Sequence, residues 1–305
     1  MMIDLVQLRT FVAVAEEQHL TRASERLHIS LSAASTHVRA IEETLGTQLF
    51  ARTNRNLELT RAGQLLFGRA KALLNEASQF TSFARELQGK IEGQLVVGSD
   101  NEPGDSRIGR IAAAVMSRHP LIQVDLRARP TASTKQGLKT GELDLGLMLE
   151  DPADPGLTYH QLTTVQFHVA GPAAWKEKLD AADWAELARL PWLAPGSGSP
   201  SYAQMLREMF EKRGLELDVV ARFDNPVLGR ALLEAGVGLM LVRQAHALRG
   251  VAEGALAISS MARAAFPLFL AHMTNRCDDP LIRAFLDAAQ EVWPGMKAAT
   301  AASHS

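Results

Sequence analysis

Three short segments near the start of the chain have the apolar spacing of helices that pack on a common core. The first covers residues 4–18. We expect the second to begin with Thr21 as its N-cap, and the third to run from a cap at Ser30 or Ser32 to about Leu45. The segment ARTNRNLELT that follows predicts two short strands joined by a turn. The order predicts a three-helix unit with a small β-hairpin.

The third predicted helix has two chemically different faces. Its inner side carries the apolar residues Ala34, Val38 and Ile41. Its outer side presents short hydrogen-bonding groups and an arginine at Ser32, Ser35, Thr36 and Arg39. A recognition helix that enters the DNA major groove needs this arrangement. The pattern therefore predicts a winged helix-turn-helix over residues 1–60, with a protein-docking module as the alternative.

Residues 61–89 form the segment with the strongest periodicity. Large and small apolar side chains each recur every seven residues, at Leu66, Leu73, Phe80 and Leu87 and at Ala70, Ala77 and Ala84. Such a heptad pattern is typical of two helices that associate. We expect a long linker helix that makes a homodimer or homotetramer; the alternative is a helix that packs on its own chain.

After the polar break QGKIEG, the pattern changes to an alternation of strands and helices. The strands QLVVGS, IQVDLRA and LDLGLML are separated by predicted helices at 105–118, with Asp105 as N-cap, and at 133–140. A similar unit starts near Val165, with helices predicted around 181–188, at 201–213, at 226–235 and last at 279–293. This βαβαβ order predicts an α/β fold with a parallel sheet covered on both faces. We expect the Ala- and Ser-rich tail after Pro294 to be mobile.

Composition excludes several classes of protein. The net charge of −2, from 32 basic and 34 acidic residues, excludes a protein that coats nucleic acid through bulk positive charge. One cysteine, Cys277, allows no intramolecular disulfide. Because no apolar run approaches the ~18 residues of a membrane span and the N-terminus is not that of a signal peptide, we expect a cytoplasmic protein with no membrane partner. No hydrolase, nucleotide-binding or metal motif occurs, so we expect neither an enzyme nor a metal or other cofactor.

The first 65 residues resemble the DNA-binding domain of the LysR-type transcriptional regulators. The matching residues are Phe11, Val14, Ala15, Glu16, Ala23, Leu27, Ser30, Ala33, Ser35, Leu45, Gly46, Leu49, Phe50, Arg52, Arg55, Leu59, Thr60, Ala62 and Gly63. The chain departs from the family pattern at Leu31 and Ser32, where Gln-Pro is usual, and at Arg243, where proline is frequent. Double-stranded DNA is thus the expected partner. The expected contact residues are Thr21, Arg22, Ser30, Leu31, Ser32, Ser35, Thr36, Arg39, Arg52 and Arg55.

The remainder of the chain resembles the same family more weakly, through its order of elements and the segment LLEAGVGLMLV. The resemblance implies two Rossmann-like subdomains of the type 2 periplasmic-binding-protein architecture over residues 90–305. Subdomain I would comprise 90–162 and 266–295, and subdomain II 163–265. It also implies a regulator that responds to a small-molecule effector and contacts RNA polymerase. The alternative is a solute-binding module whose N-terminal unit docks protein rather than DNA.

Ligands of open α/β sheets bind beyond the carboxyl ends of strands, beside helix N-termini. The candidate effector contacts are Ser99, Asp100, Asn101, Thr131, Ser133, Met148, Ser197, Ser199, Ser201 and Asn225. Each serine or threonine taken alone is better explained as a plain N-cap, and only the set facing one cleft indicates an effector site. Helix N-termini favour an anionic effector, yet Asp100, Glu102 and Asp105 near the same loop oppose one unless Arg230 and Arg243 offset them.

Overall fold

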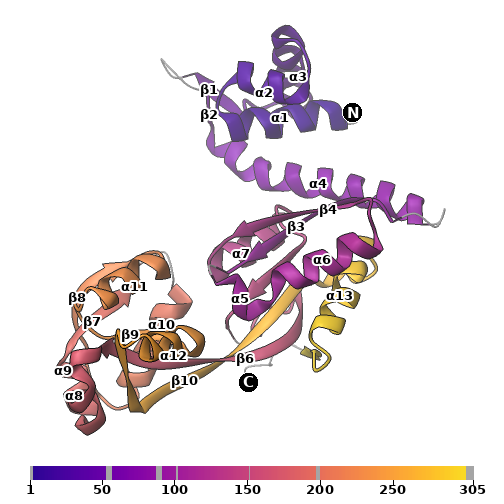
Figure 1. Ribbon diagram of the computed structural model, residues 1–305. Helices are drawn as coiled ribbons and strands as arrows, with labels where there is room; N and C mark the ends of the chain where they lie inside the picture. The colour runs from indigo at the N-terminus through magenta and orange to yellow at the C-terminus, as the bar shows by residue number, and fades with distance from the viewer. Residues whose placement is uncertain are drawn as a thin grey trace. The chain divides into compact units, whose positions relative to one another are not determined.

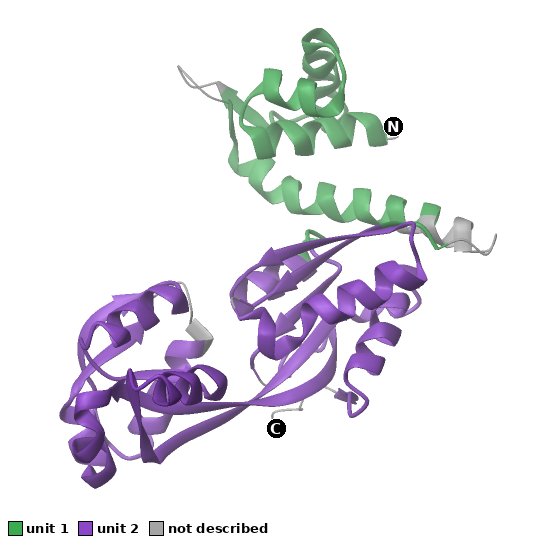
Figure 2. Ribbon diagram, viewed as in Figure 1, with its two compact units in different colours: residues 1–93, 139–142 green, residues 94–138, 143–305 purple. Residues whose placement is uncertain are grey.

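The computed structural model forms two compact units (Figures 1 and 2). It describes residues 3–52, 57–86, 91–100, 102–150, 152–196 and 200–299. Unit 1 comprises residues 1–93 and 139–142, and unit 2 comprises residues 94–138 and 143–305. No helix in the described ranges is long and apolar enough to cross a membrane.

Unit 1 has the predicted order of elements. It contains α1 (Leu5–Glu17), α2 (Leu20–Leu27), α3 (Leu31–Leu45), β1 (Phe50–Arg52), β2 (Leu57–Leu59) and the long α4 (Arg61–Glu86). Its core is centred on Phe11, whose ring packs edge-on against Phe50 and Phe67 with centroids 5.6 and 6.5 Å away. The hairpin and the linker helix therefore share one core with the three helices.

The helix caps of unit 1 correct one prediction and decide another. Thr21 is not the N-cap of α2; that position belongs to His19, whose ring Nδ1 accepts a hydrogen bond from the Thr21 backbone N–H. Ser30, not Ser32, caps α3, because its hydroxyl accepts from the Ala33 N–H at 3.1 Å. Gly46 ends α3 with a φ of +64°, a conformation that costs glycine little.

Two side chains and one glycine fix the hairpin against the neighbouring helices. Glu42 of α3 accepts backbone hydrogen bonds from Leu49 and Phe50. Thr60 donates to the Gln48 carbonyl and accepts from the Gly63 N–H, so it also caps α4. A Cβ atom at Gly63 would lie 2.2 Å from the Leu49 carbonyl oxygen, so only glycine fits where α4 passes the hairpin.

Unit 2 has two halves, which we name near and far by the order in which the chain first enters them. The near half holds β3 (Gly93–Ser99), β4 (Ile122–Ala128) and β5 (Leu145–Met148) with α5 (Pro103–Ser106), α6 (Ile108–Arg118), α7 (Thr131–Lys139) and α13 (Pro280–Val292). The far half holds β7 (Pro191–Pro195), β8 (Asp218–Phe223) and β9 (Met240–Arg243) with α8 (Lys176–Ala181), α9 (Trp184–Arg189), α10 (Pro200–Glu211), α11 (Pro226–Glu234) and α12 (Gln244–Ala252).

Two long antiparallel strands, β6 (Leu157–Pro172) and β10 (Leu256–Met273), run through both halves (Figure 1). Their pairing is interrupted by a register shift between Ile258 and Arg263. β3 and β5 pair in parallel as predicted, whereas β10 adds to β5 antiparallel, so the sheet is mixed and not wholly parallel. The sheet order is β11-β6-β10-β5-β3-β4, where β11 is the short strand Lys297–Ala299, and β9 pairs with β6.

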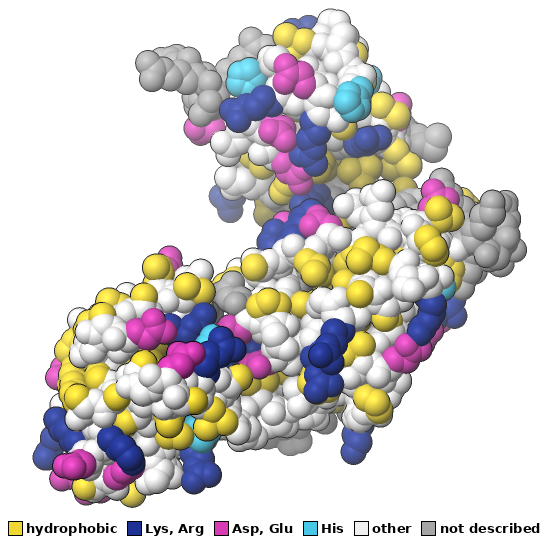
Figure 3. Space-filling view, viewed as in Figure 1, with side chains coloured by type: hydrophobic (Ala, Val, Ile, Leu, Met, Phe, Trp, Pro, Cys, Tyr) yellow, Lys and Arg dark blue, Asp and Glu magenta, His cyan; other side chains and the backbone are white. Residues whose placement is uncertain are grey.

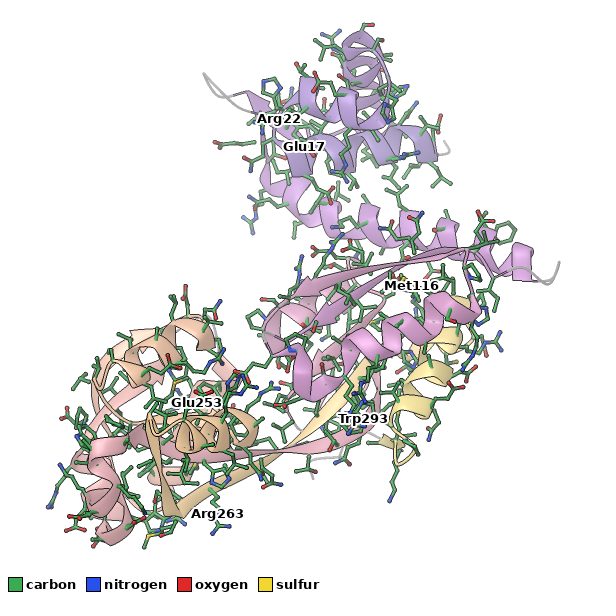
Figure 4. The ribbon with its side chains drawn as sticks, in the orientation of Figure 1. Glu17, Arg22, Met116, Glu253, Arg263 and Trp293 are labelled. Carbon is green, nitrogen blue, oxygen red and sulfur yellow. The ribbon has the colours of Figure 1, made fainter. Side chains whose placement is uncertain are left out.

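The sequence interpretation misplaced several local features of unit 2. The predicted helix 105–118 is split into α5 and α6 by Arg107, whose φ is +53°. Asp105 is therefore inside α5 and is not an N-cap. Trp293, labelled in Figure 4, contacts both residues at this break. Its indole N–H donates to the Ser106 carbonyl, and the Arg107 guanidinium lies 4.1 Å from its ring centroid.

Three further elements differ from the pattern. The predicted helix 181–188 corresponds to α9, which begins only at Trp184, and the separate helix α8 ends at Ala181. α12 had no counterpart in the prediction. The tail is ordered at its start, since β11 (Lys297–Ala299) pairs with β6.

Candidate functional sites

The exposed face of α3 gathers most of the predicted DNA-contact residues of this helix. Ser32, Thr36 and Arg39 are exposed, and Ser35 is half-buried. The Ser32 hydroxyl lies 2.9 Å from that of Ser30, and the Thr36 hydroxyl donates to the Ser32 carbonyl. Leu31 begins the helix with 49% of its surface exposed. The face is thus short, polar and accessible, as groove contact requires.

Arginines on this unit fall into two groups. The side chains of Arg22 and Arg39 are exposed and make no hydrogen bond or ion pair with any described residue. Arg26, by contrast, pairs with Glu16 and Glu17 at 2.8 and 3.2 Å. Figure 4 labels Arg22 and Glu17. Arg22 and Arg39 are therefore available to phosphates or bases, whereas Arg26 serves to neutralise carboxylates.

Glu16 shows how unit 1 accommodates its acidic residues. Lys71 of α4 lies 3.1 Å from its carboxylate, in addition to Arg26. Burial raises the pKa of Glu16, but the hydrogen bonds from Arg26 and Lys71 outweigh it and hold the pKa below the usual value. A negative net charge thus coexists with an unpaired basic surface elsewhere on the unit.

The remaining predicted DNA contacts are placed less fully. Thr21 is exposed within the first turn of α2. Arg52 ends β1, but its side chain lies outside the described residues, and so does Arg55.

The heptad positions of α4 divide into two parts. Leu66 and Ala70 belong to the core of unit 1. Leu73 and Phe80 are 49% and 77% exposed, and Ala77 is half-buried. The Ala84 side chain and Leu87 lie outside the described residues. The first part of the pattern therefore packs on its own chain, and the second presents large apolar side chains to solvent.

A cavity of about 100 Å³ lies between the two halves of unit 2. The near half lines it with Asp100, Glu102, Arg129, Pro130, Thr131 and Leu149. The far half and the crossing strand β6 line it with Phe167, Tyr202, Met205, Pro226, Arg230, Met240, Leu241, Val242 and Arg243. Most of these side chains are apolar, and the charged ones gather at one place, as is usual for a small-molecule site.

Ion pairs join the two halves across this cavity. The Arg243 guanidinium, at the end of β9, donates to Asp100 and, at 3.1 Å, to Asp105. It also donates to the Glu102 carbonyl, and its Nε lies 3.3 Å from the Glu102 carboxylate. Arg230 of α11 donates to the same carboxylate. Charged side chains of both signs are visible on this unit in Figure 3.

Burial sets the protonation of this cluster. Desolvation raises the pKa of Asp100 above the usual value, although Arg243 opposes the rise. Burial alone would lower the pKa of Arg243, but the carboxylates of Asp100 and Glu102 reverse the effect and raise it. The Tyr202 hydroxyl is also buried here, which raises its pKa and keeps it neutral. Arg243 therefore stays charged in its buried position and is engaged by the surrounding carboxylates.

The structure brings only part of the predicted effector set to the cavity. Asp100 and Thr131 line it. Ser99 is buried beside them and donates to the Asp100 carbonyl. Met148 lies in the core with Leu138 and Tyr159.

Two other predicted contacts, Ser133 and Asn225, are not on the lining as far as the structure describes it. Ser133 is exposed on α7, and Asn225 is an exposed N-cap that accepts from the Val227 N–H. Asn101, Ser197 and Ser199 lie outside the described residues, as does the Ser201 side chain. The apolar lining was missed because Phe167, Met205 and Met240 read simply as core residues in the sequence.

Comparison with known proteins decides the family. The bacterial regulatory helix-turn-helix domain of the lysR family matches residues 5–64, and the LysR substrate binding domain matches residues 88–294. The chain belongs to the LysR family. It is a LysR-type DNA-binding transcriptional regulator with a substrate-binding domain.

Relatives of this LysR-family chain extend over most of its length. The regulator PtxR of Pseudomonas aeruginosa is 29% identical, covering 83% of this chain and 81% of PtxR. The regulator TfdS of Cupriavidus pinatubonensis is 28% identical, covering 94% of this chain and 98% of TfdS. Both are named as transcriptional regulators, not enzymes. Neither comparison supports an N-terminal unit that docks protein.

Solved structures agree with the fold. A full-length OxyR variant from Pseudomonas aeruginosa superposes with a TM-score of 0.72 at 21% identity, covering 97% of this chain and 98% of OxyR. CbnR, described as a LysR family transcriptional regulator, superposes with a TM-score of 0.67 at 22% identity, covering 95% and 99%. CbnR has also been solved in complex with its target DNA. The predicted family and fold class are confirmed.

Proposed function

We propose that a small molecule bound in the cavity of unit 2 modulates sequence-specific DNA binding by unit 1. The observation that carries the proposal is the lining of the cavity by both halves, with Arg243 of one half paired to Asp100 and Asp105 of the other. A ligand that contacts both halves favours one separation of them over another, and so shifts the population of regulator states.

On DNA, α3 would enter the major groove. Ser32, Ser35, Thr36 and Arg39 would approach base edges, and Arg22 is free to meet a phosphate. Arg52 and Arg55 would take the same phosphate role beside the hairpin. Paired units would read half-sites separated by about 34 Å or a multiple of it.

Pairing of units would come from α4. Leu73 and Phe80 are large, apolar and exposed, which is unfavourable in an isolated helix. A second copy that covers them makes a homodimer or homotetramer. We also propose that the protein works in the cytoplasm, where the chromosome is, and contacts RNA polymerase there.

The test fills the cavity. Leu149→Trp adds bulk to the lining. The matched control, Leu126→Trp, changes an exposed leucine on β4 outside the cavity. DNA binding by wild type and both variants is measured with and without a bacterial metabolite extract. We expect the extract to change the affinity of wild type and of Leu126→Trp but not of Leu149→Trp. An equal response in all three would contradict an effector site in this cavity.

A further inference from the structure

The arginines that line the cavity are already occupied by the protein itself. All three nitrogens of the Arg243 guanidinium face carboxylates or a carbonyl of the near half, and its side chain is only 7% exposed. Arg230 is paired with Glu102. Arg129, the third arginine of the lining, also has an interaction of its own. A carboxylate ligand would therefore have to displace an existing partner.

Displacement would leave a buried carboxylate of the protein poorly solvated and without its arginine. Asp100 and Glu102 are largely buried beside the cavity, with 17% and 12% of their side chains exposed. A buried carboxylate that loses its arginine keeps its desolvation penalty and loses the compensating attraction. An entering anion would also be repelled by the three carboxylates of Asp100, Glu102 and Asp105.

One acceptor in the cluster has no hydrogen-bond donor. The Oε2 atom of Glu102 is buried and accepts no hydrogen bond from the described residues. Its neighbours are Arg243 Nε at 3.3 Å and His246 Nε2 at 3.6 Å, and neither makes a hydrogen bond to it. A ligand N–H would satisfy this atom, and a ligand carboxylate would not.

From these contacts we propose that the effector is a compact, mainly apolar molecule that carries an amine or amide N–H and no carboxylate. Glu102 receives the N–H, and Leu149, Phe167 and Met240 surround the apolar body. The inference rests on the proposed function and replaces the anion expected from the sequence. Arg230 and Arg243 are already paired with carboxylates of the protein. Binding of an anion would break these buried ion pairs, so the cavity selects against anions.

The first test uses two matched series of small probes. They are isobutyramide, isobutylamine and isobutyrate, and benzamide, benzylamine and benzoate. Affinity for the full-length protein is measured by NMR titration and by thermal shift. Hydrogen bonds to a charged group favour the donor, so in the series that fits the cavity we expect an amide or amine to bind at least about tenfold more tightly than the carboxylate.

The second test uses one substitution to change the preference between the amide or amine probes and the carboxylate probes. Glu102→Gln removes a negative charge and frees part of Arg230 and Arg243 for a ligand. We expect the preference to shift toward the carboxylate by about tenfold or more. Glu177→Gln, an exposed glutamate on α8, is the matched control and should leave the preference unchanged. If Glu102→Gln does not fold, Asp105→Asn tests the same cluster from its more exposed edge.

The outcomes separate the two proposals. Tighter binding of isobutyrate or benzoate by wild type would overturn the ligand class but leave the cavity as the effector site. An unchanged preference in the folded Glu102→Gln protein would also overturn the ligand class. If no probe of either series binds, both the ligand class and the cavity as an effector site are contradicted.

Discussion

Arg243 of β9 lies 3.1 Å from Asp105 of α5, so a charged contact joins the two halves of unit 2, through which β6 and β10 run as continuous strands. The resemblance to the family leads one to expect proline at this position. Arginine here gives the chain buried ion pairs that join the two halves. It also explains why three acidic residues are tolerated beside an apolar cavity.

Replacement of Arg243 by alanine should strongly destabilise unit 2. Removing one partner of a buried ion pair costs about 3–5 kcal/mol, since the carboxylates stay buried without compensation. The loss should be smaller at about pH 5 than at about pH 7, because without Arg243 the pKa of Asp100 rises further and protonation then favours the folded state.

Urea denaturation at the two pH values measures this effect. Arg189→Ala, an exposed arginine on α9, is the control and should change the free energy of unfolding little. Equal losses for Arg243→Ala and Arg189→Ala would show that the ion pairs across the cavity contribute nothing.

Substitution of Arg39 should weaken DNA binding, whereas substitution of Arg26 should not. Arg39 is exposed and unpaired within the described chain, and Arg26 is engaged by Glu16 and Glu17. Loss of one base-contacting arginine costs about 1–3 kcal/mol and relaxes sequence preference. Fluorescence anisotropy on a cognate and a scrambled duplex compares Arg39→Ala with Arg26→Ala. The same loss for both variants would remove the α3 face from DNA recognition.

A charge on the exposed part of α4 should break the proposed assembly. Phe80→Asp places a carboxylate where 77% of the aromatic side chain is exposed, so the fold of unit 1 should survive while an apolar interface would not. Sedimentation velocity should show a smaller species than wild type. Gln64→Asp, also exposed on α4, should keep the wild-type value. An unchanged assembly in Phe80→Asp would exclude this face as the interface.

Two glycines of α4 should respond to alanine in opposite ways. Gly63→Ala forces a Cβ to within 2.2 Å of the Leu49 carbonyl oxygen and should destabilise unit 1 by about 1–3 kcal/mol. At Gly68 the nearest atom would be 3.7 Å away, so alanine should stabilise the helix by about 0.5–1 kcal/mol. Thermal melting of both variants checks the signs. Destabilisation by Gly68→Ala would contradict the packing described for this helix.

The pair His160 and His272 on the crossing strands should make stability depend on pH. Their Nε2 atoms are 3.2 Å apart, and His272 Nδ1 donates to the Met273 carbonyl. The neutral His272 Nε2 is then the acceptor, so His160 donates. Burial, together with the charge that His272 would carry, lowers the pKa of His160 to about 4, and burial lowers that of His272.

Because the folded state holds these rings neutral, the unfolded state binds more protons between about pH 4 and about pH 6.5. The contribution of the neutral histidine pair to the free energy of unfolding is fully present above about pH 6.5 and is lost as the pH falls toward about 4. His160→Gln keeps an N–H donor for His272 and should flatten the dependence in a denaturation series. His119→Gln, at the C-cap of α6, is the control and should leave the dependence as it is in wild type. A wild-type stability that stays constant across this range would contradict the neutral pair.

Local pattern predicted local structure well. The apolar spacing of α1 and α3 and the heptads of α4 follow from periodicity within one helix, and these elements lie where they were expected. Features that depend on backbone detail were missed: the cap at His19 and the left-handed Arg107 that divides α5 from α6 have no signal in residue type. The pairing of β11 with β6 likewise depends on a distant strand.

The residues that meet at the candidate cavity were harder to predict from the sequence. The sequence placed Arg230 and Arg243 as possible offsets to the acids, and the structure pairs them with Glu102, Asp100 and Asp105. The partners are far apart in the chain, so no spacing could reveal which groups meet. Among the described loop residues singled out by strand ends, Asp100 and Thr131 line the cavity and Ser133 and Asn225 do not, while apolar side chains from the far half form much of the described lining.

The most direct measurement is a pull-down of genomic DNA fragments with the purified protein, followed by sequencing at two salt concentrations, in parallel with Arg39→Ala. We predict a small set of enriched fragments with paired half-sites, enrichment that weakens as salt rises, and loss of that set in the variant. Uniform recovery of all fragments, or the same set from Arg39→Ala, would contradict recognition of specific DNA by the α3 face.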